Sequence, residues 1–141
     1  MTRKRLFVAL ATLAIAALAA AFTYWPPIND VATDSTPEYP DIRAQVFARP
    51  IKEVYKAAYD EALAMGWNVA GSEAHMRIEA VATTPILRFH DDVTIALSRE
   101  AKGTRVAIRS RSRVGRADFG TNARRIRAYQ HALANRLATQ G

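Results

Sequence analysis

The sequence has 141 residues, enough for one domain and a short additional segment. Half of the residues are hydrophobic, so the composition allows a packed core, and the formal net charge at pH 7 is +7. The sequence contains no cysteine, which excludes disulfide bonds, thiolate metal sites, thiol catalysis and a lipid anchor attached to cysteine.

The first 25 residues have the composition of a membrane segment. Three basic residues, Arg3, Lys4 and Arg5, precede an uncharged stretch over residues 6–25. Twenty helical residues rise about 30 Å, which is the thickness of the hydrocarbon core of a bilayer. Because the basic end of such a helix stays in the cytoplasm, we expect a single-pass anchor in the cytoplasmic membrane. Its N-terminus would lie inside, and the remaining chain would lie in the periplasm or outside the cell.

A cleaved signal peptide is the alternative interpretation of the same segment. Ala19, Ala20 and Ala21 fit the small-residue pattern of a cleavage site, and cleavage would release a secreted or periplasmic protein. The uncharged stretch is long for a signal peptide, so we favour retention as an anchor. Both interpretations place the chain from residue 26 onward outside the cytoplasm.

Residues 26–41 form an opening segment that contains four prolines and four acidic residues. By composition alone this segment is a linker. The residues that follow it have the periodicities of a mixed domain. We therefore expect three parts: a membrane anchor or signal segment over residues 1–25, the opening segment over residues 26–41, and an α+β domain over residues 42–141.

Hydrophobic periodicity divides this domain into one strand, one helix, four further strands and a second helix. The first strand is predicted where Ile42, Ala44 and Val46 alternate with their neighbours. In the first helix, apolar residues recur at helical spacing, and Glu61 is expected to face water. The predicted strands cover residues 42–47, about 67–71, 77–84, 92–98 and 104–114, and the predicted helices cover residues 50–65 and about 122–137.

Alternation in the strands predicts a sheet with one wet face and one covered face, and two amphipathic helices are what one covered face needs. We therefore expect an α+β fold in which an antiparallel sheet of about five strands carries two helices on one side. If Leu97 lies opposite Val106 in the last hairpin, the register places Asp92 opposite Arg111, whereas a shift by two residues would pair Asp92 with Arg109 or Arg113. Part of the arginine row on the last strand would then be paired within the sheet.

Charge is divided unevenly along the chain. Residues 99–141 contain 11 basic and 2 acidic residues, whereas residues 26–98 contain 6 basic and 11 acidic residues. We interpret this division mainly as ion pairing inside the domain. An anionic partner, such as phospholipid headgroups near the anchor, is an alternative, and unlike patches also permit head-to-tail contacts in a homo-oligomer. We expect no nucleic-acid binding, because the domain is predicted to be exported.

Arginines also crowd the first turns of the last predicted helix, where the helix dipole disfavours cations. A compensating negative charge is expected. Asp118 could cap the helix or pair with these side chains, the acidic segment at Asp30 and Asp34 could fold back on them, or an external anion could bind there. The candidate site is thus a cluster that binds an anion or forms structural ion pairs, and its members are Asp30, Asp34, Asp92, Arg109, Arg111, Arg113, Arg116, Asp118, Arg124 and Arg125.

Catalytic and metal sites are not predicted. Asp91 and Asp92 follow His90, but alternation sends the two carboxylates to opposite faces of the sheet, so we expect no metal ion and no cofactor. A hydrolytic pair would need two carboxylates that flank one cleft. Asp118-Phe119-Gly120 matches a kinase triplet only by chance. In its loop we expect a positive φ at Gly115, Phe119 packed on the core, and a helix cap from residue 121 or 122.

Residues 109–122, Arg-Ser-Arg-Ser-Arg-Val-Gly-Arg-Ala-Asp-Phe-Gly-Thr-Asn, resemble the signature of the domain-of-unknown-function family numbered 1499. Residues 27–34 resemble the opening element of that family, and residues 77–80 and 89–93 resemble its middle. The resemblance covers about residues 26–137. It implies that residues 28–34 belong to the domain, packed on it, rather than to a free linker. The family has no established biochemical activity, so the resemblance implies no reaction.

These features predict a membrane-tethered, exported domain of unestablished molecular function. A non-enzymatic binding or assembly module is the favoured interpretation, with the membrane as one partner and a second protein or a second copy of the chain as another. A carrier with an apolar ligand between helices and sheet is an alternative. A hydrolytic enzyme that uses Asp30 and Asp34 with Arg116 and Asp118 is a weaker one.

Overall fold

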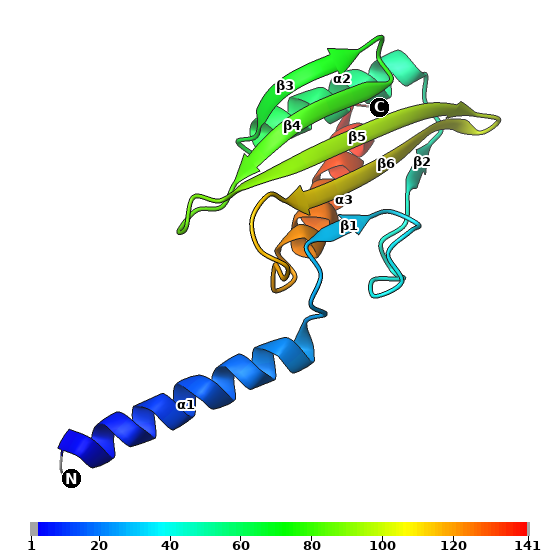
Figure 1. Cartoon of the computed structure of the whole chain (residues 1–141). Helices are drawn as coiled ribbons and strands as arrows, with labels where there is room; N and C mark the ends of the chain where they lie inside the picture. The colour runs from blue at the N-terminus through cyan, green and yellow to red at the C-terminus, as the bar shows by residue number, and fades with distance from the viewer. Residues whose placement is uncertain (1–2, 141) are drawn as a thin grey trace.

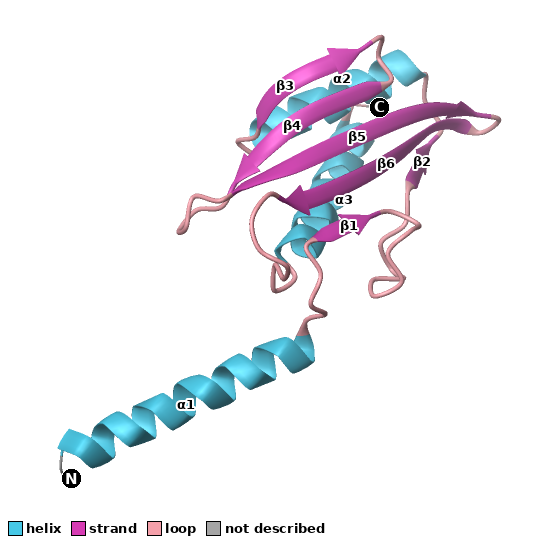
Figure 2. Ribbon diagram, in the orientation of Figure 1, coloured by secondary structure: helices cyan, strands magenta, loops and turns pink. Residues whose placement is uncertain are grey.

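Three helices and a six-stranded sheet make up most of residues 3–140, the part of the chain that the computed structural model describes (Figure 1). Figure 2 shows the same elements coloured by type. The predicted α+β class is confirmed, with one strand more than expected. The elements in chain order are α1 (Arg3–Tyr24), β1 (Asp30–Ala32), β2 (Gln45–Phe47), α2 (Ile51–Ala64), β3 (Asn68–Glu73), β4 (Arg77–Thr83), β5 (His90–Glu100), β6 (Gly103–Ser112) and α3 (Thr121–Thr139).

Strand β6 organises the sheet because it pairs with three other strands. Its whole length pairs with β5 on one edge, and the short strands β1 and β2 pair with its other edge, one after the other. The sheet continues from β5 through β4 to β3, and all pairs are antiparallel. The predicted register of the last hairpin is confirmed, since Leu97 lies opposite Val106 and Asp92 lies opposite Arg111.

Helices α2 and α3 both pack on one face of the sheet, as predicted (Figure 1). Alternating residues of β4, β5 and β6 are buried against them, and the residues between these point to the opposite, open face. At the centre of the core, Tyr129 of α3 stacks on Trp67 with ring centroids 5.1 Å apart. The Tyr129 hydroxyl donates a hydrogen bond of 2.9 Å to the carbonyl oxygen of Ala58 in α2. The two helices and the sheet therefore share one core.

Two predictions for the region before β3 are wrong. The strand expected over residues 42–47 is confined to β2, with Ile42 buried in the preceding turn and Val46 exposed, because only three residues pair with the edge of β6. Glu61 does not face water but is buried between the helices, where Arg136 of α3 donates a hydrogen bond of 2.7 Å to its carboxylate. A cation on the neighbouring helix thus makes a charged residue compatible with an inward position.

The opening segment contributes a strand and two core residues, Val31 and Tyr39, to the domain. Strand β1 pairs with residues 109–111 of β6, and Val31 at its centre is fully buried. After β1, the N–H of Thr33 donates to the carbonyl of Ile108, and the N–H of Asp34 donates to the carbonyl of Ile42, both at 3.0 Å. Composition predicts a linker at these residues, whereas the family resemblance implies a part of the domain.

Helix α1 projects away from the domain, at the end where α3 begins (Figure 1). It has the length and hydropathy of a membrane span or a signal sequence, and none of its described residues is buried. Its last turn contacts the domain, because Phe22 lies against Phe119 in the loop between β6 and α3, with ring centroids 5.3 Å apart. Phe119 therefore packs against α1, not on the core as predicted.

Candidate functional site

Two carboxylate–guanidinium pairs lie on the open face of the sheet. Arg109 of β6 donates two hydrogen bonds to Asp30 of β1, with Nε 2.8 Å from Oδ1. Arg113, just after β6, donates two hydrogen bonds to Oδ1 of Asp92 on β5, at 2.9 and 2.6 Å. Arg111 lies opposite Asp92 in the register, but its guanidinium approaches Asp30 at 4.0 Å. The ion pair of Asp92 is therefore diagonal across the two strands.

These arginines keep both carboxylates ionised. The hydrogen bonds from Arg109 hold the pKa of Asp30 below its ordinary value, against the opposing effect of partial burial. The hydrogen bonds from Arg113 lower the pKa of Asp92 in the same way. All four side chains are partly exposed, so solvent screens the pairs and each contributes little to stability. This part of the sheet face holds charges that are already partnered.

Asp34 and Asp41 join the opening segment to two other elements. The carboxylate of Asp34 accepts hydrogen bonds from Arg105 of β6 and from the backbone N–H of Ala44. Asp41 was not among the candidate residues. Arg127 of α3 donates two hydrogen bonds to it, at 2.7 and 2.9 Å, and these lower its pKa. Acidic residues of the opening segment therefore pair with arginines of the C-terminal half, as predicted. The pairs also include residues outside the predicted cluster, namely Asp41, Arg105 and Arg127.

Asp118 caps α3, which is one of the two roles predicted for it. Its Oδ1 accepts a hydrogen bond of 2.9 Å from the N–H of Gly120, and its Oδ2 accepts one of 2.8 Å from the N–H of Asn122. The cap expected from Thr121 or Asn122 is thus wrong, because the carboxylate of Asp118 reaches amides that lie two and four residues after it. A negative charge at this end also offsets the helix dipole beside the arginines.

Arg124 and Arg116 lie near this cap but make different contacts. Arg124 donates a hydrogen bond of 2.8 Å to the carbonyl of Phe119 and lies over the ring of Trp25, with its guanidinium carbon 5.7 Å from the ring centroid. Arg116 is exposed, and within residues 3–140 its side chain makes no ion pair. The predicted residues therefore divide between the open sheet face and the start of α3 and do not converge on one site.

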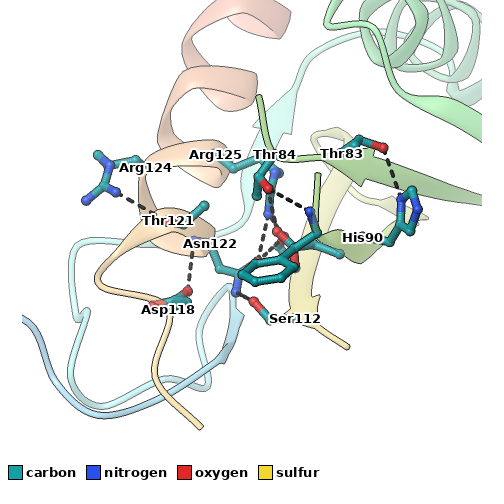
Figure 3. Close-up of polar contacts among 12 residues, drawn as sticks. Thr83, Thr84, His90, Ser112, Asp118, Thr121, Asn122, Arg124 and Arg125 are labelled. Atoms are coloured by element: carbon teal, nitrogen blue, oxygen red, sulfur yellow. Dashed lines mark hydrogen bonds and ion pairs between the residues drawn. The ribbon is translucent and has the colours of Figure 1, made fainter. Parts of the chain in front are cut away.

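A buried polar network joins β5, β6 and α3, and its acidic member, Asp91, was not among the predicted site residues. Arg125 donates hydrogen bonds to Oδ2 of Asp91 at 2.6 Å, to Ser110 at 2.9 Å and to Asn122 at 2.8 Å. Asn122 in turn donates to Ser112, and Figure 3 shows it between Ser112 and Asp118. The side chains of Asp91 and Arg125 are only 2% and 10% exposed, so this is a desolvated charge pair.

An apolar cleft of about 780 Å³ opens beside this network, at the end of the domain from which α1 projects. Its walls are two loops, residues 84–89 between β4 and β5 and residues 113–120 between β6 and α3. Ile86, Leu87, Phe89 and Val114 line it and are exposed. We call this hollow the anchor-end cleft. The apolar groove predicted between helices and sheet is filled by core side chains, so the hollow lies at the edge of the layers instead.

The acidic residues at the base of the anchor-end cleft are already bonded. Asp91 binds Arg125 and Asp118 caps α3, so neither carboxylate is placed as a free acid or base. Among the side chains that the structure describes, those of residues 3–71 and 74–140, no group of three or more His, Cys, Asp or Glu is arranged to hold a metal ion. Asp91 is buried and Asp92 is exposed, as alternation predicts. The arrangement is suited to binding an apolar group rather than to acid–base chemistry.

Comparisons with known proteins agree with the family resemblance. The sequence profile of the family described as "Protein of unknown function (DUF1499)" matches residues 23–133. No curated protein was found to match the chain. These findings carry no information about a reaction or a ligand.

Solved structures with a similar arrangement have low sequence identity to this chain. Protein MLL2253 from Mesorhizobium loti is 11% identical with a TM-score of 0.54, over 79% of this chain and 98% of that one. CalU16 from Micromonospora echinospora is 15% identical with a TM-score of 0.49, over 68% and 71%. Protein CV1439 from Chromobacterium violaceum is 13% identical with a TM-score of 0.48, over 79% and 96%. The likeness to MLL2253 supports the fold alone.

Proposed function

Because the chain belongs to the family of proteins of unknown function DUF1499, whose description assigns no activity, we propose a function from the geometry of this chain. The protein is a membrane-tethered, exported, non-enzymatic binding module, and it holds an apolar molecule in the anchor-end cleft. Its α1 helix is retained as a single span with the basic N-terminus in the cytoplasm. The α+β domain lies on the outer face of the cytoplasmic membrane.

The observation that carries this proposal is the apolar lining of the anchor-end cleft. Soluble domains rarely expose several large aliphatic and aromatic side chains side by side, and such patches mark binding sites. Ile86, Leu87, Phe89 and Val114 form such a group around one hollow. The volume of about 780 Å³ is within the range of small-molecule sites.

Site-specific photo-crosslinking in living cells tests the ligand. A photoreactive residue is placed at Phe89, which lines the anchor-end cleft, and at Leu63 as a control, because Leu63 is an exposed aliphatic residue on α2. We expect an adduct with a lipid or another small apolar molecule at position 89 and none at position 63. A protein adduct at position 89 would favour an assembly module instead, and no adduct at all would overturn the proposed binding function.

The tether and its orientation require a separate measurement. The chain has no cysteine, so Ser98→Cys on the open sheet face introduces a single thiol. We expect a membrane-impermeant maleimide to label this thiol in cells whose outer barrier has been opened but whose cytoplasmic membrane is intact. An N-terminal tag should stay with alkali-washed membranes. Loss of the tag would show cleavage of the leader, and a protected thiol would contradict the orientation.

A further inference from the structure

The connection between α1 and the domain is short and is bound to the domain. Only five residues separate Tyr24 at the end of α1 from Asp30 at the start of β1, and five residues extend over about 20 Å at most. The carbonyl of Ile28 accepts a hydrogen bond from Asp118, and the carbonyl of Asn29 accepts one from Ser112, at 3.0 and 2.8 Å. If α1 spans the membrane, this end of the domain is held close to its surface.

The two loops that form the anchor-end cleft lie at this same end. In Figure 1 the β4–β5 and β6–α3 loops are on the side of α1, and the β5–β6 turn is at the opposite end of the sheet. The 113–120 loop contacts α1 directly through Phe119 and Phe22. The 113–120 loop is therefore continuous with the candidate membrane span, and the 84–89 loop faces it across the anchor-end cleft.

The tip of the 84–89 loop is apolar and points into solvent. Ile86 is 88% exposed and Leu87 is 67% exposed, and both follow Pro85 in a loop without strand pairing. Val114 extends the same surface from the other loop. In water these exposed aliphatic side chains contribute no hydrophobic stabilisation. In the interfacial region of a bilayer their apolar surface would be removed from water, which is favourable.

Each of the two loops carries one basic residue. Arg88 follows Leu87 directly, and Arg116 lies in the other loop. Both are exposed, and neither forms an ion pair with any side chain of residues 3–71 and 74–140, the side chains that the structure describes. The nearby acids do not offset them, because Asp91 and Asp118 are buried and bonded. Apolar tips flanked by arginines match the chemistry of an anionic membrane surface, in which the side chains reach headgroup phosphates.

We propose that the 84–89 and 113–120 loops insert into the membrane in which α1 is anchored, with Ile86 and Leu87 among the acyl chains and Arg88 and Arg116 on anionic headgroups. This inference rests on the proposed function and names the occupant of its site. The anchor-end cleft then opens directly toward the lipid, and a membrane lipid is the apolar molecule that enters it. The domain is held by two contacts, the span and the loops.

Depth-dependent fluorescence of the full chain in nanodiscs tests the insertion. Leu87→Cys and Ser98→Cys each provide a single thiol for an environment-sensitive fluorophore, because the natural chain has none. In nanodiscs that contain phosphatidylglycerol, we expect the label at position 87 to emit at shorter wavelength and to be quenched by lipids with a nitroxide near the headgroup. The label at position 98 should remain in water. A label at position 87 that behaves like that at position 98 would overturn the proposal.

A charge variant tests the headgroup contact. The double variant Arg88→Glu/Arg116→Glu should abolish the quenching at position 87, whereas Lys102→Glu at the β5–β6 turn should leave it unchanged. Equal quenching in all variants would overturn the role of the arginines. Failure of insertion, together with a small-molecule adduct at Phe89 in cells, would leave the binding function standing with a soluble ligand. Failure of both measurements would remove both proposals.

Discussion

Asp91 of β5 and Arg125 of α3 form a buried ion pair, with Oδ2 of Asp91 2.6 Å from Nη2 of Arg125. Removing one partner of such a pair leaves an uncompensated charge in the interior. Asp91→Leu should therefore destabilise the domain by about 3–5 kcal/mol. Urea unfolding of the chain in mild detergent, followed by circular dichroism, measures this loss.

The double variant Asp91→Leu/Arg125→Met is the control for this pair. It replaces both charges with apolar groups, a change that is often neutral or stabilising. We expect it to be more stable than Asp91→Leu alone. If the single variant unfolds at the same urea concentration as the natural protein, the pair is not desolvated as the structure indicates.

The hydroxyl of Tyr129 links the two helices by donating to the carbonyl of Ala58. Burial raises the pKa of this phenol, so it stays protonated as a donor. Tyr129→Phe removes this bond but leaves the Ala58 carbonyl with its partner inside α2, so the change should cost about 0.5–1.5 kcal/mol. Tyr59→Phe, at the edge of the core, is the matched control and should change the free energy of unfolding much less. Equal effects of the two changes in thermal melts would contradict the assigned bond.

Stability should fall in acid through the carboxylates on the sheet face. Because Arg109 and Arg113 lower the pKa values of Asp30 and Asp92 in the folded protein, the unfolded chain takes up protons first as the pH falls. The two ion pairs stabilise the fold fully when the pH is above the pKa of an aspartate in the unfolded chain, near 3.8. This stabilisation is lost as the pH falls through the lower pKa values of Asp30 and Asp92 in the folded protein. Asp30→Asn should make the acid limb of a stability–pH curve less steep. An unchanged limb would show that the pair is not formed in solution.

Backbone conformation makes Gly115 sensitive to substitution. Its φ is +82°, as the sequence predicted for the end of this strand, and a Cβ atom there would make only an ordinary van der Waals contact, 3.9 Å from the carbonyl oxygen of Ala117. Gly115→Val should therefore destabilise mainly through backbone strain, by about 1–3 kcal/mol. A Cβ atom at Gly71 would have open space, and the φ of Gly71 is outside the left-handed region, so Gly71→Val should be tolerated. Thermal melts compare the two, and similar melting temperatures would contradict the loop conformation.

Periodicity was sufficient to predict most of the fold. The two domain helices and the β5–β6 register follow from the spacing of residues such as Ile95, Leu97, Val106 and Ile108, because burial on one face imposes that spacing. The strand before α2 was predicted too long. Alternation over residues 42–47 does not reveal how many of these residues can pair with the edge of β6. Strand β1 has only three residues, and its pairing with β6 depends on contacts nearly 80 residues away.

The site was less predictable because its partners lie on different elements. Asp91 alternates in step with Val93 and Ile95, so the sequence could have predicted that it faces the core. Its partner Arg125, however, lies on a helix 34 residues later. The anchor-end cleft forms where two loops meet at the end of the sheet. Ile86 and Leu87 in a loop after Pro85 were the signal that could have indicated it.

The pairing of β1 with β6 also determines when the domain can close. Asp30 is among the first residues after α1, yet Arg109, which binds it, is synthesised 79 residues later. At ribosomal speeds of 5–20 residues per second, this delay is roughly 4–16 s. Throughout that interval Val31 lacks both its partner strand β6 and the helix α3 that packs against β1, so a short apolar segment of the nascent chain stays exposed.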